Sequence, residues 1–244
     1  MNVAALKRMA MGGIVLAMSA PAFAQLEPET PTGSHIPVKP KAVDKERTGY
    51  IMKSVARCIF SHNKAMAQRL LTHSDPIAID FVKVGTTPSK MARDLGLLDC
   101  LGEEVDVDET ALGLRMSLLT LRARLLEEDY LTRNPVPPAI VPEASTVRTY
   151  VAKEAELPKA MAIGEFSDCI VKEDFRGSDA LVRTMPGSNA ERAAARVLTP
   201  TLGKCLYIGQ QLELTPSSVR VYVVDGLRMR SVGAQLTSSG LKAQ

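Results

Sequence analysis

Apolar residues recur at helical spacing in the chain after residue 48. Around residue 55 they occupy positions i, i+4, i+7 and i+8, which form one face of a helix; these are Ile51, Val55, Cys58 and Ile59. Around residue 120 they recur at i, i+4, i+7 and i+11, and these are Leu114, Leu118, Leu121 and Leu125. Because this helical spacing recurs along the chain, we predict an all-α fold.

Capping residues mark where several of these helices begin. Thr87-Pro88 predicts a helix that runs through Leu98 towards Cys100, because threonine caps well and proline tolerates the first helical position. Thr110 is the expected cap of the leucine-rich helix. The β-branched run 219–224 alone favours a strand, but Thr215-Pro216 stands before it. We therefore predict a helix there.

The same plan is present twice in the sequence. A shift of 111 residues carries Cys58 onto Cys169, and a shift of 105 residues carries Cys100 onto Cys205. Apolar neighbours follow the cysteines in both copies. We predict two homologous helical units in tandem, over residues 49–131 and 151–230.

Three other segments lack apolar periodicity. Residues 25–48 are rich in proline and charge, which predicts a disordered leader. Residues 132–150 contain four prolines and should link the two units without a regular helix. Residues 231–244 are small and polar, and we predict a flexible tail.

The amino terminus has the pattern of a secretory signal peptide. Lys7 and Arg8 precede the apolar stretch 9–18, and Ala22-Phe23-Ala24 forms an A-x-A cleavage site. The apolar stretch is too short for a membrane anchor, which needs about 20 residues. We predict that residues 1–24 are removed after Ala24, and that the mature chain is periplasmic or secreted without a membrane span.

Composition and charge exclude some classes of partner. Aromatic residues make up 4% of the chain and tryptophan is absent, which argues against carbohydrate or base-stacking sites. Removal of Lys7 and Arg8 lowers the formal charge from +3 to +1. A chain whose positive and negative charges nearly cancel gives no electrostatic reason to expect nucleic-acid binding.

Four cysteines form an even set in a chain predicted to be exported, which favours disulfides. Four cysteines allow three connectivities. The repeat favours the pairs Cys58–Cys100 and Cys169–Cys205, which staple each unit; pairing between the units is the alternative. Each bridge would close a loop of about 40 residues and stabilise the fold by roughly 4 kcal/mol.

The cysteines also allow other chemistry. Cys58 and His62 are spaced i, i+4 on one helix, and Cys100 could complete a set of metal ligands. The second unit has Glu173 where the first has His62, so the set is not repeated. A nucleophilic cysteine would need a free thiolate beside a base such as His62 or His73. Disulfides are the better interpretation, and we expect neither metal nor cofactor.

The remaining polar candidates have structural explanations. One acidic run comprises Glu103, Glu104, Asp106, Asp108 and Glu109. It lacks the spacing of a calcium-binding loop, so we interpret it as a solvent-exposed edge. Arg115 and Arg220 occupy matching places and could bind an anion together, but salt bridges to this edge are favoured. Ser188 has no nucleophile-elbow context and forms a capping box with Glu191.

One family resembles this sequence. The stretch 166–206 combines Cys169-Ile170-Val171, Pro186-Gly187-Ser188 and Cys205-Leu206. In these motifs it is similar to small, uncharacterised exported proteins of alphaproteobacteria, mainly sphingomonads, that carry a two-cysteine repeat. The resemblance implies export and a repeat architecture, but no activity. The first unit departs from the motif, with Asp75-Pro76 in place of Pro-Gly.

No sequence motif specifies a reaction. The leading hypothesis is a non-enzymatic envelope protein that binds a partner protein or a small ligand in the groove between the two units. The alternative is an enzyme, or an enzyme-associated factor, that acts on an envelope substrate. Its carboxylates would be Glu173 with Asp174, or Glu103 with Glu104.

Overall fold

The computed structural model describes residues 44–104, 117–139, 148–207 and 212–238. These residues form α-helices and no strand; the antiparallel bridge Ser74–Ile79 is isolated. The predicted all-α fold is confirmed. None of the helices in this part of the chain has the length and hydropathy needed to cross a bilayer. The predicted signal peptide and cleavage site lie outside the described residues.

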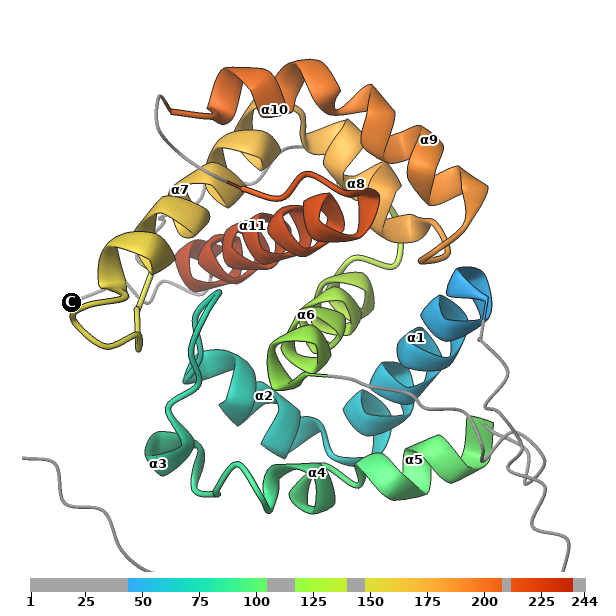
Figure 1. Ribbon diagram of the computed structural model, residues 1–244, viewed down its shortest axis with the longest axis vertical. Coiled ribbons are helices and arrows are strands. Elements are labelled where there is room, and N and C mark those ends of the chain that lie inside the picture. Colours follow the sequence, from blue (N-terminus) through green and yellow to red (C-terminus); the bar gives the residue numbers. More distant parts are fainter. Residues whose placement is uncertain (1–43, 105–116, 140–147, 208–211, 239–244) are drawn as a thin grey trace, which may run out of the picture. The chain divides into compact units, whose positions relative to one another are not determined.

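Six described helices belong to the first half of the chain (Figure 1). They are α1 (Lys45–His62), α2 (Lys64–Thr72), α3 (Phe81–Val84), α4 (Met91–Asp94), α5 (Leu97–Glu104) and α6 (Leu118–Arg133). Five described helices belong to the second half: α7 (Leu157–Glu173), α8 (Phe175–Arg183), α9 (Asn189–Val197), α10 (Thr199–Cys205) and α11 (Pro216–Ser238).

The first two helices of each half have matching bounds. A single residue, Asn63, separates α1 from α2, and a single residue, Asp174, separates α7 from α8. The shift of 111 residues carries the end of α1 onto the end of α7, and α2 onto α8. The helix plan therefore agrees with the predicted repeat over these elements, while the homology of the two units stays a prediction.

The predicted cysteine pairing is confirmed. Cys58–Cys100 joins α1 to α5, and Cys169–Cys205 joins α7 to α10, across 42 and 36 residues of sequence. Each bridge lies within its own half, as the repeat suggested. Cys100 and Cys205 are buried, so each staple also fills part of the core.

Several helix boundaries differ from the predicted ones. Ser117, rather than Thr110, caps α6, and its hydroxyl accepts a hydrogen bond from the Thr120 N–H. Residues 105–116, which include Thr110 and Leu114, lie outside the described residues. The single helix predicted up to Cys100 is divided into α4 and α5, because Gly96 has a positive φ of 67°.

The helical part of the chain also extends beyond its predicted bounds at both ends. Helix α1 begins at Lys45, inside the predicted leader, and α11 continues to Ser238, inside the predicted tail. Small polar residues are compatible with helix once a long helix has been nucleated and packed. The helix predicted over the β-branched run is confirmed, and Thr215 caps it by accepting from the Ser218 N–H.

The core is aliphatic and continuous between the two halves. Helix α11 packs against α7, α6 and α8, and α1 packs against α6 and α5. Helices α11 and α7 approach each other closely at Gly226, where a Cβ atom would lie 2.4 Å from the carbonyl oxygen of Ser167. Helices α6 and α11 therefore form the junction where the two halves meet.

Candidate functional site

The α6–α11 junction contains a buried ion pair. Arg220 Nη2 lies 2.7 Å from Glu127 Oε1, and Arg220 Nε lies 2.8 Å from Glu127 Oε2. Arg220 also donates to the carbonyls of Leu181, Val182 and Thr184. Burial alone would raise the pKa of Glu127, but the hydrogen bonds and charge of Arg220 lower it to about 2. These contacts make Arg220 a structural residue.

A second ion pair repeats the first with the helices exchanged. Arg122 of α6 donates from Nη2 to Asp225 of α11 at 2.8 Å. In each helix the arginine precedes the acid by five residues, so a shift of 98 residues carries Arg122 onto Arg220 and Glu127 onto Asp225. Arg115, which the repeat matches with Arg220, lies outside the described residues. The two buried ion pairs make Arg122 of α6 the counterpart of Arg220 of α11.

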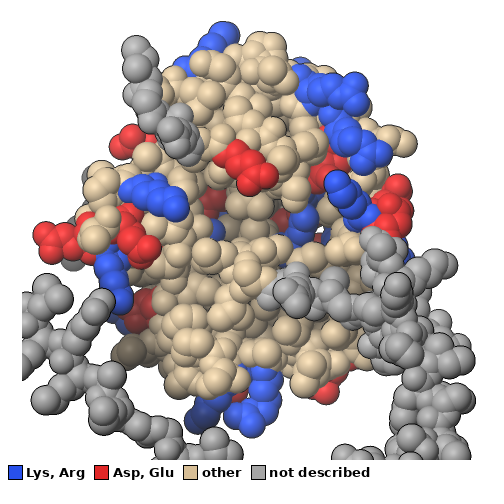
Figure 2. Space-filling model, in the orientation of Figure 1, with Lys and Arg blue, Asp and Glu red and all other residues tan. Residues whose placement is uncertain are grey.

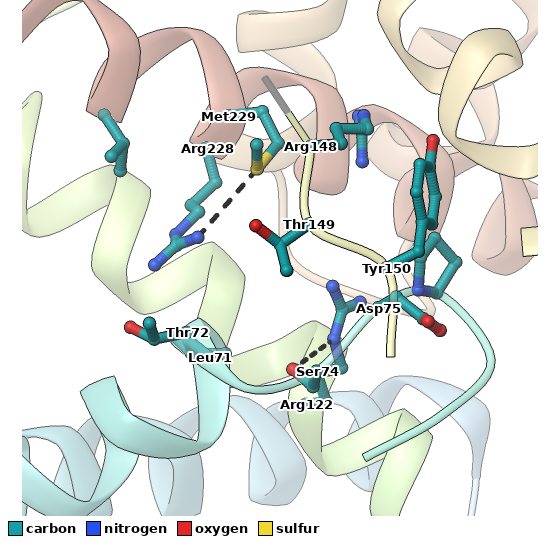
Figure 3. Close-up of a pocket in the computed structure, with 12 residues that line it drawn as sticks. Leu71, Thr72, Ser74, Asp75, Arg122, Arg148, Thr149, Tyr150, Arg228 and Met229 are labelled. Atoms are coloured by element: carbon teal, nitrogen blue, oxygen red, sulfur yellow. Dashed lines mark hydrogen bonds between the residues drawn. The ribbon is translucent and has the colours of Figure 1, made fainter. Parts of the chain in front are cut away.

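A cavity of about 300 Å³ lies beside the Arg122–Asp225 pair (Figure 3). Both halves contribute to it: the turn after α2, helix α6, the segment 148–150 and the end of α11. Its lining residues are Leu71, Thr72, Ser74, Asp75, Pro76, Arg122, Arg148, Thr149, Tyr150, Arg228, Met229 and Val232. The cavity thus occupies the groove between the halves, where the sequence analysis expected a ligand.

Three arginines line this cavity, and they differ in how fully their donors are used. Each of the three guanidinium nitrogens of Arg148 has a carboxylate partner: Nε and Nη2 donate to Asp168, and Nη1 donates to Asp225. Arg122 donates from Nε to Ser74 and from Nη2 to Asp225, which leaves Nη1 without a partner among the described residues.

Arg228 has the most unused donor capacity. Its Nε lies 3.2 Å from Asp129 Oδ2, its Nη1 lies 3.9 Å from the Met229 sulfur, and Nη2 has no partner within the described ranges. The side chain is 12% exposed. Burial lowers the pKa of Arg228 although the charge of Asp129 opposes this. A further anion beside the guanidinium would compensate for its lost hydration.

Asp75 is the acidic residue in the cavity wall, and both of its carboxylate oxygens accept hydrogen bonds from the backbone. Its Oδ1 accepts from the N–H groups of Ile77 and Ala78, and its Oδ2 accepts from those of Val151 and Ala152. The carboxylate therefore ties the turn after α2 to the segment before α7. With all four acceptor positions occupied, Asp75 is not placed to act as a general base.

The other candidates from the sequence lie away from the cavity. Glu173 is exposed at the end of α7, and Asp174 caps α8 by accepting from the Gly177 N–H. Ser188 caps α9 by accepting from the Glu191 N–H, while Glu191 accepts from the Gly187 N–H instead of the N–H of Ser188. These groups do not converge on one site.

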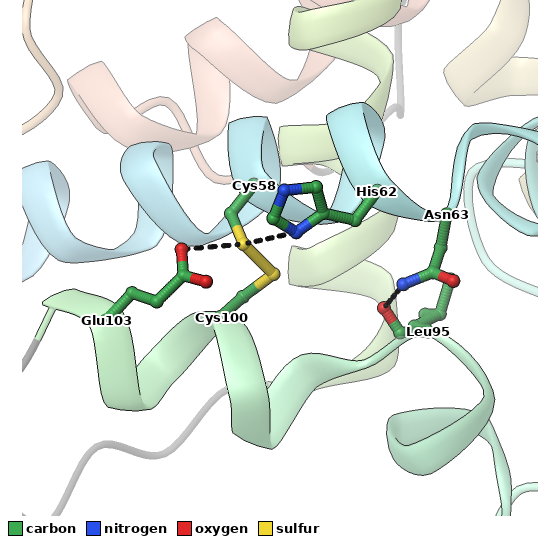
Figure 4. The surroundings of a disulfide bond; sticks show 6 residues. All are labelled: Cys58, His62, Asn63, Leu95, Cys100 and Glu103. Atoms are coloured by element: carbon green, nitrogen blue, oxygen red, sulfur yellow. Dashed lines mark hydrogen bonds between the residues drawn. A yellow bond between two sulfur atoms is a disulfide. The ribbon is translucent and has the colours of Figure 1, made fainter.

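The first disulfide has His62 beside it, as the spacing predicted, and also Glu103, which was not predicted there (Figure 4). His62 Nδ1 lies 3.6 Å from Cys58 Sγ, and Glu103 Oε2 lies 3.4 Å from the same sulfur. His73 ends α2 and is not part of this group. The side chain of Glu104 and the acids Asp106, Asp108 and Glu109 lie outside the described residues.

Charges of both signs are interspersed on the face shown in Figure 2. No single-sign field covers that face, which agrees with the balanced composition. An anion would therefore be selected by contacts inside the cavity and not by long-range attraction. Comparison of the chain with protein-family models, with curated proteins and with solved structures found no match.

Proposed function

We propose that this chain is an exported, non-enzymatic binding module that holds a small anionic ligand in the cavity between its two halves. The observation that carries the proposal is the pair of arginines, Arg122 and Arg228, whose unused N–H donors line one cavity. A volume of about 300 Å³ is at the lower end of small-molecule sites.

The ligand class follows from the donors. A guanidinium matches carboxylate and phosphate oxygens, and such charge-assisted hydrogen bonds are stronger than neutral ones. The hydroxyl of Thr149 adds a neutral donor at the cavity wall, whereas the hydroxyl of Thr72 already donates to the Gln68 carbonyl. The cavity has room for a dicarboxylate or a phosphate ester of a few carbons, but not for a polymer chain.

Export is supported by the two disulfides, since such bonds persist in oxidising compartments. The signal-peptide pattern and the resemblance to exported alphaproteobacterial proteins point the same way. A binding role is favoured over the enzyme alternative because its named carboxylates do not line the cavity, and Asp75 is held by four backbone N–H groups.

Isothermal titration at constant ionic strength tests the proposal. The oxidised chain is titrated with phosphate, sulfate, acetate and succinate, and then the Arg228→Gln variant and an Arg176→Gln control are titrated with the tightest of these anions. Arg176 is exposed on α8 and is not among the residues that line the cavity. Loss of a charge-assisted hydrogen bond costs about 1.5–3 kcal/mol, so R228Q should bind roughly 10- to 100-fold more weakly.

R176Q should bind as the unmodified chain does. The proposal is rejected if none of the four anions binds at one site per chain. It is also rejected if R228Q, with an unchanged circular dichroism spectrum, binds as tightly as the unmodified protein.

A further inference from the structure

The surroundings of the Cys58–Cys100 disulfide already have the spacing of a metal site. Cys58 Sγ, Cys100 Sγ and a ring nitrogen of His62 all lie within 4.8 Å of one another. Cys58 and His62 are spaced i, i+4 on α1, while Cys100 and Glu103 are spaced i, i+3 on α5. Helices α1 and α5 therefore hold three ligand atoms close together (Figure 4), and Glu103 Oε2, 3.4 Å from Cys58 Sγ, is not part of that group.

The distances fit zinc. Zinc bonds of about 2.3 Å to sulfur and about 2.0 Å to nitrogen, in a tetrahedron, place these two ligand atoms about 3.5 Å apart. His62 Nδ1 lies 3.6 Å from Cys58 Sγ, which matches this separation. His62 and Glu103 are exposed and Cys58 is half-buried, so an ion could reach the group from solvent.

The bond between the two sulfurs is what prevents coordination. A cysteine sulfur must be a free thiolate to bind zinc. Two zinc-bound sulfurs lie about 3.8 Å apart, much farther than two sulfurs joined by a covalent bond. We propose that reduction of Cys58–Cys100 converts this staple into a zinc site with Cys58, Cys100 and His62 as ligands and a water molecule as the fourth. The site is redox-gated, because the disulfide and the bound metal exclude each other.

The chemistry balances with a phosphine as reductant. The S–S bond takes up two electrons from the phosphine and two protons from water, and the water oxygen leaves as phosphine oxide. Zinc then displaces the two thiol protons, which pass to the buffer, and binds both thiolates. Neutral His62 supplies its lone pair without releasing a proton.

The second half provides an internal control. Cys169–Cys205 has the same place in its half, but Glu173 occupies the position of His62. Among the described residues, the Cys58, His62 and Cys100 group is the one with metal-ligand geometry. Reduction of the whole chain should therefore create one tight site and not two.

The test is cobalt titration of the whole chain after reduction with tris(2-carboxyethyl)phosphine under argon. Cobalt is the probe because thiolate coordination gives it charge-transfer absorption, which zinc then removes by displacing it. We expect one tightly bound cobalt per reduced chain and none in the oxidised chain. His62→Ala should weaken binding by at least about tenfold, and Glu173→Ala should leave it unchanged.

Circular dichroism keeps the result interpretable if reduction loosens the fold. Metal should then restore the helical signal in the reduced unmodified chain but not in the His62→Ala variant, because the binding free energy is coupled to folding. The proposal is overturned if the reduced chain binds no cobalt, if His62→Ala binds it as tightly, or if Glu173→Ala loses the site equally.

Discussion

Arg220 of α11 and Glu127 of α6 form a two-point ion pair in which each side chain is 1% exposed. The pair lies where the halves meet, and Lys53 and Arg124 also contact the same carboxylate. One negative charge therefore serves three cations. The core is continuous across this point, so the junction acts as part of the interior and not as a contact between separate domains.

Neutralising Glu127 should strongly destabilise the protein. Glu127→Gln removes the two-point partner of buried Arg220 and leaves it only the longer ion pair with Glu191 at 3.3 Å, and breaking a buried pair in this way costs about 3–5 kcal/mol. The free energy of unfolding in urea measures the effect. Glu154→Gln is the control, because Glu154 is exposed, and it should change stability by less than about 0.5 kcal/mol. Equal stability of the two variants would contradict this account.

Acid should weaken the fold through the same carboxylate. The pKa of Glu127 is about 2 in the folded protein, below its ordinary value of 4.5. A lowered folded-state pKa contributes stability that is present above 4.5 and lost as the pH falls towards 2. The contribution is on the order of 3 kcal/mol. Unfolding free energies between these two pH values should fall less steeply in Glu127→Gln than in the unmodified protein.

Glu128 should behave in the opposite sense to its neighbour. Burial raises the pKa of Glu128, although Arg57 opposes this, and its Oε1 has no hydrogen-bond partner among the described residues. A carboxylate with a raised folded-state pKa destabilises the fold when ionised. Glu128→Gln should therefore raise the unfolding free energy at pH 7, and the gain should shrink as the pH falls below the raised pKa. A loss of stability at pH 7 would contradict this prediction.

Gly226 should be irreplaceable, because α11 and α7 approach each other there. A Cβ atom would lie 2.4 Å from the Ser167 carbonyl oxygen, so Gly226→Ala forces two core helices apart and should cost about 1–3 kcal/mol. Gly203 is the matched control. It lies in α10 with nothing within 4 Å of its Cβ position, and alanine there should add up to about 1 kcal/mol of stability. Thermal unfolding of both variants separates the effect of steric packing on stability from the effect of helix propensity.

The sequence by itself predicted the all-α fold and favoured the cysteine pairing. The 3.6-residue period defines the buried face of α1, and the repeat that carries Cys58 onto Cys169 and Cys100 onto Cys205 favours one bridge within each half. The sequence also placed His62 one helical turn from Cys58. These features follow from local geometry, which is fixed by spacing along the chain.

The tertiary structure alone decided the register of α6 against α11 and the location of the cavity. Arg122, Asp225 and Arg228 look like ordinary surface charges in the sequence, because burial of a charge depends on partners more than ninety residues away. Arg115, which the repeat matches with Arg220, lies outside the described residues, whereas packing shows Arg122 in the second ion pair. Which arginine donors remain unused is likewise set by three-dimensional contacts, since each neighbour that satisfies one of them comes from a different helix or loop.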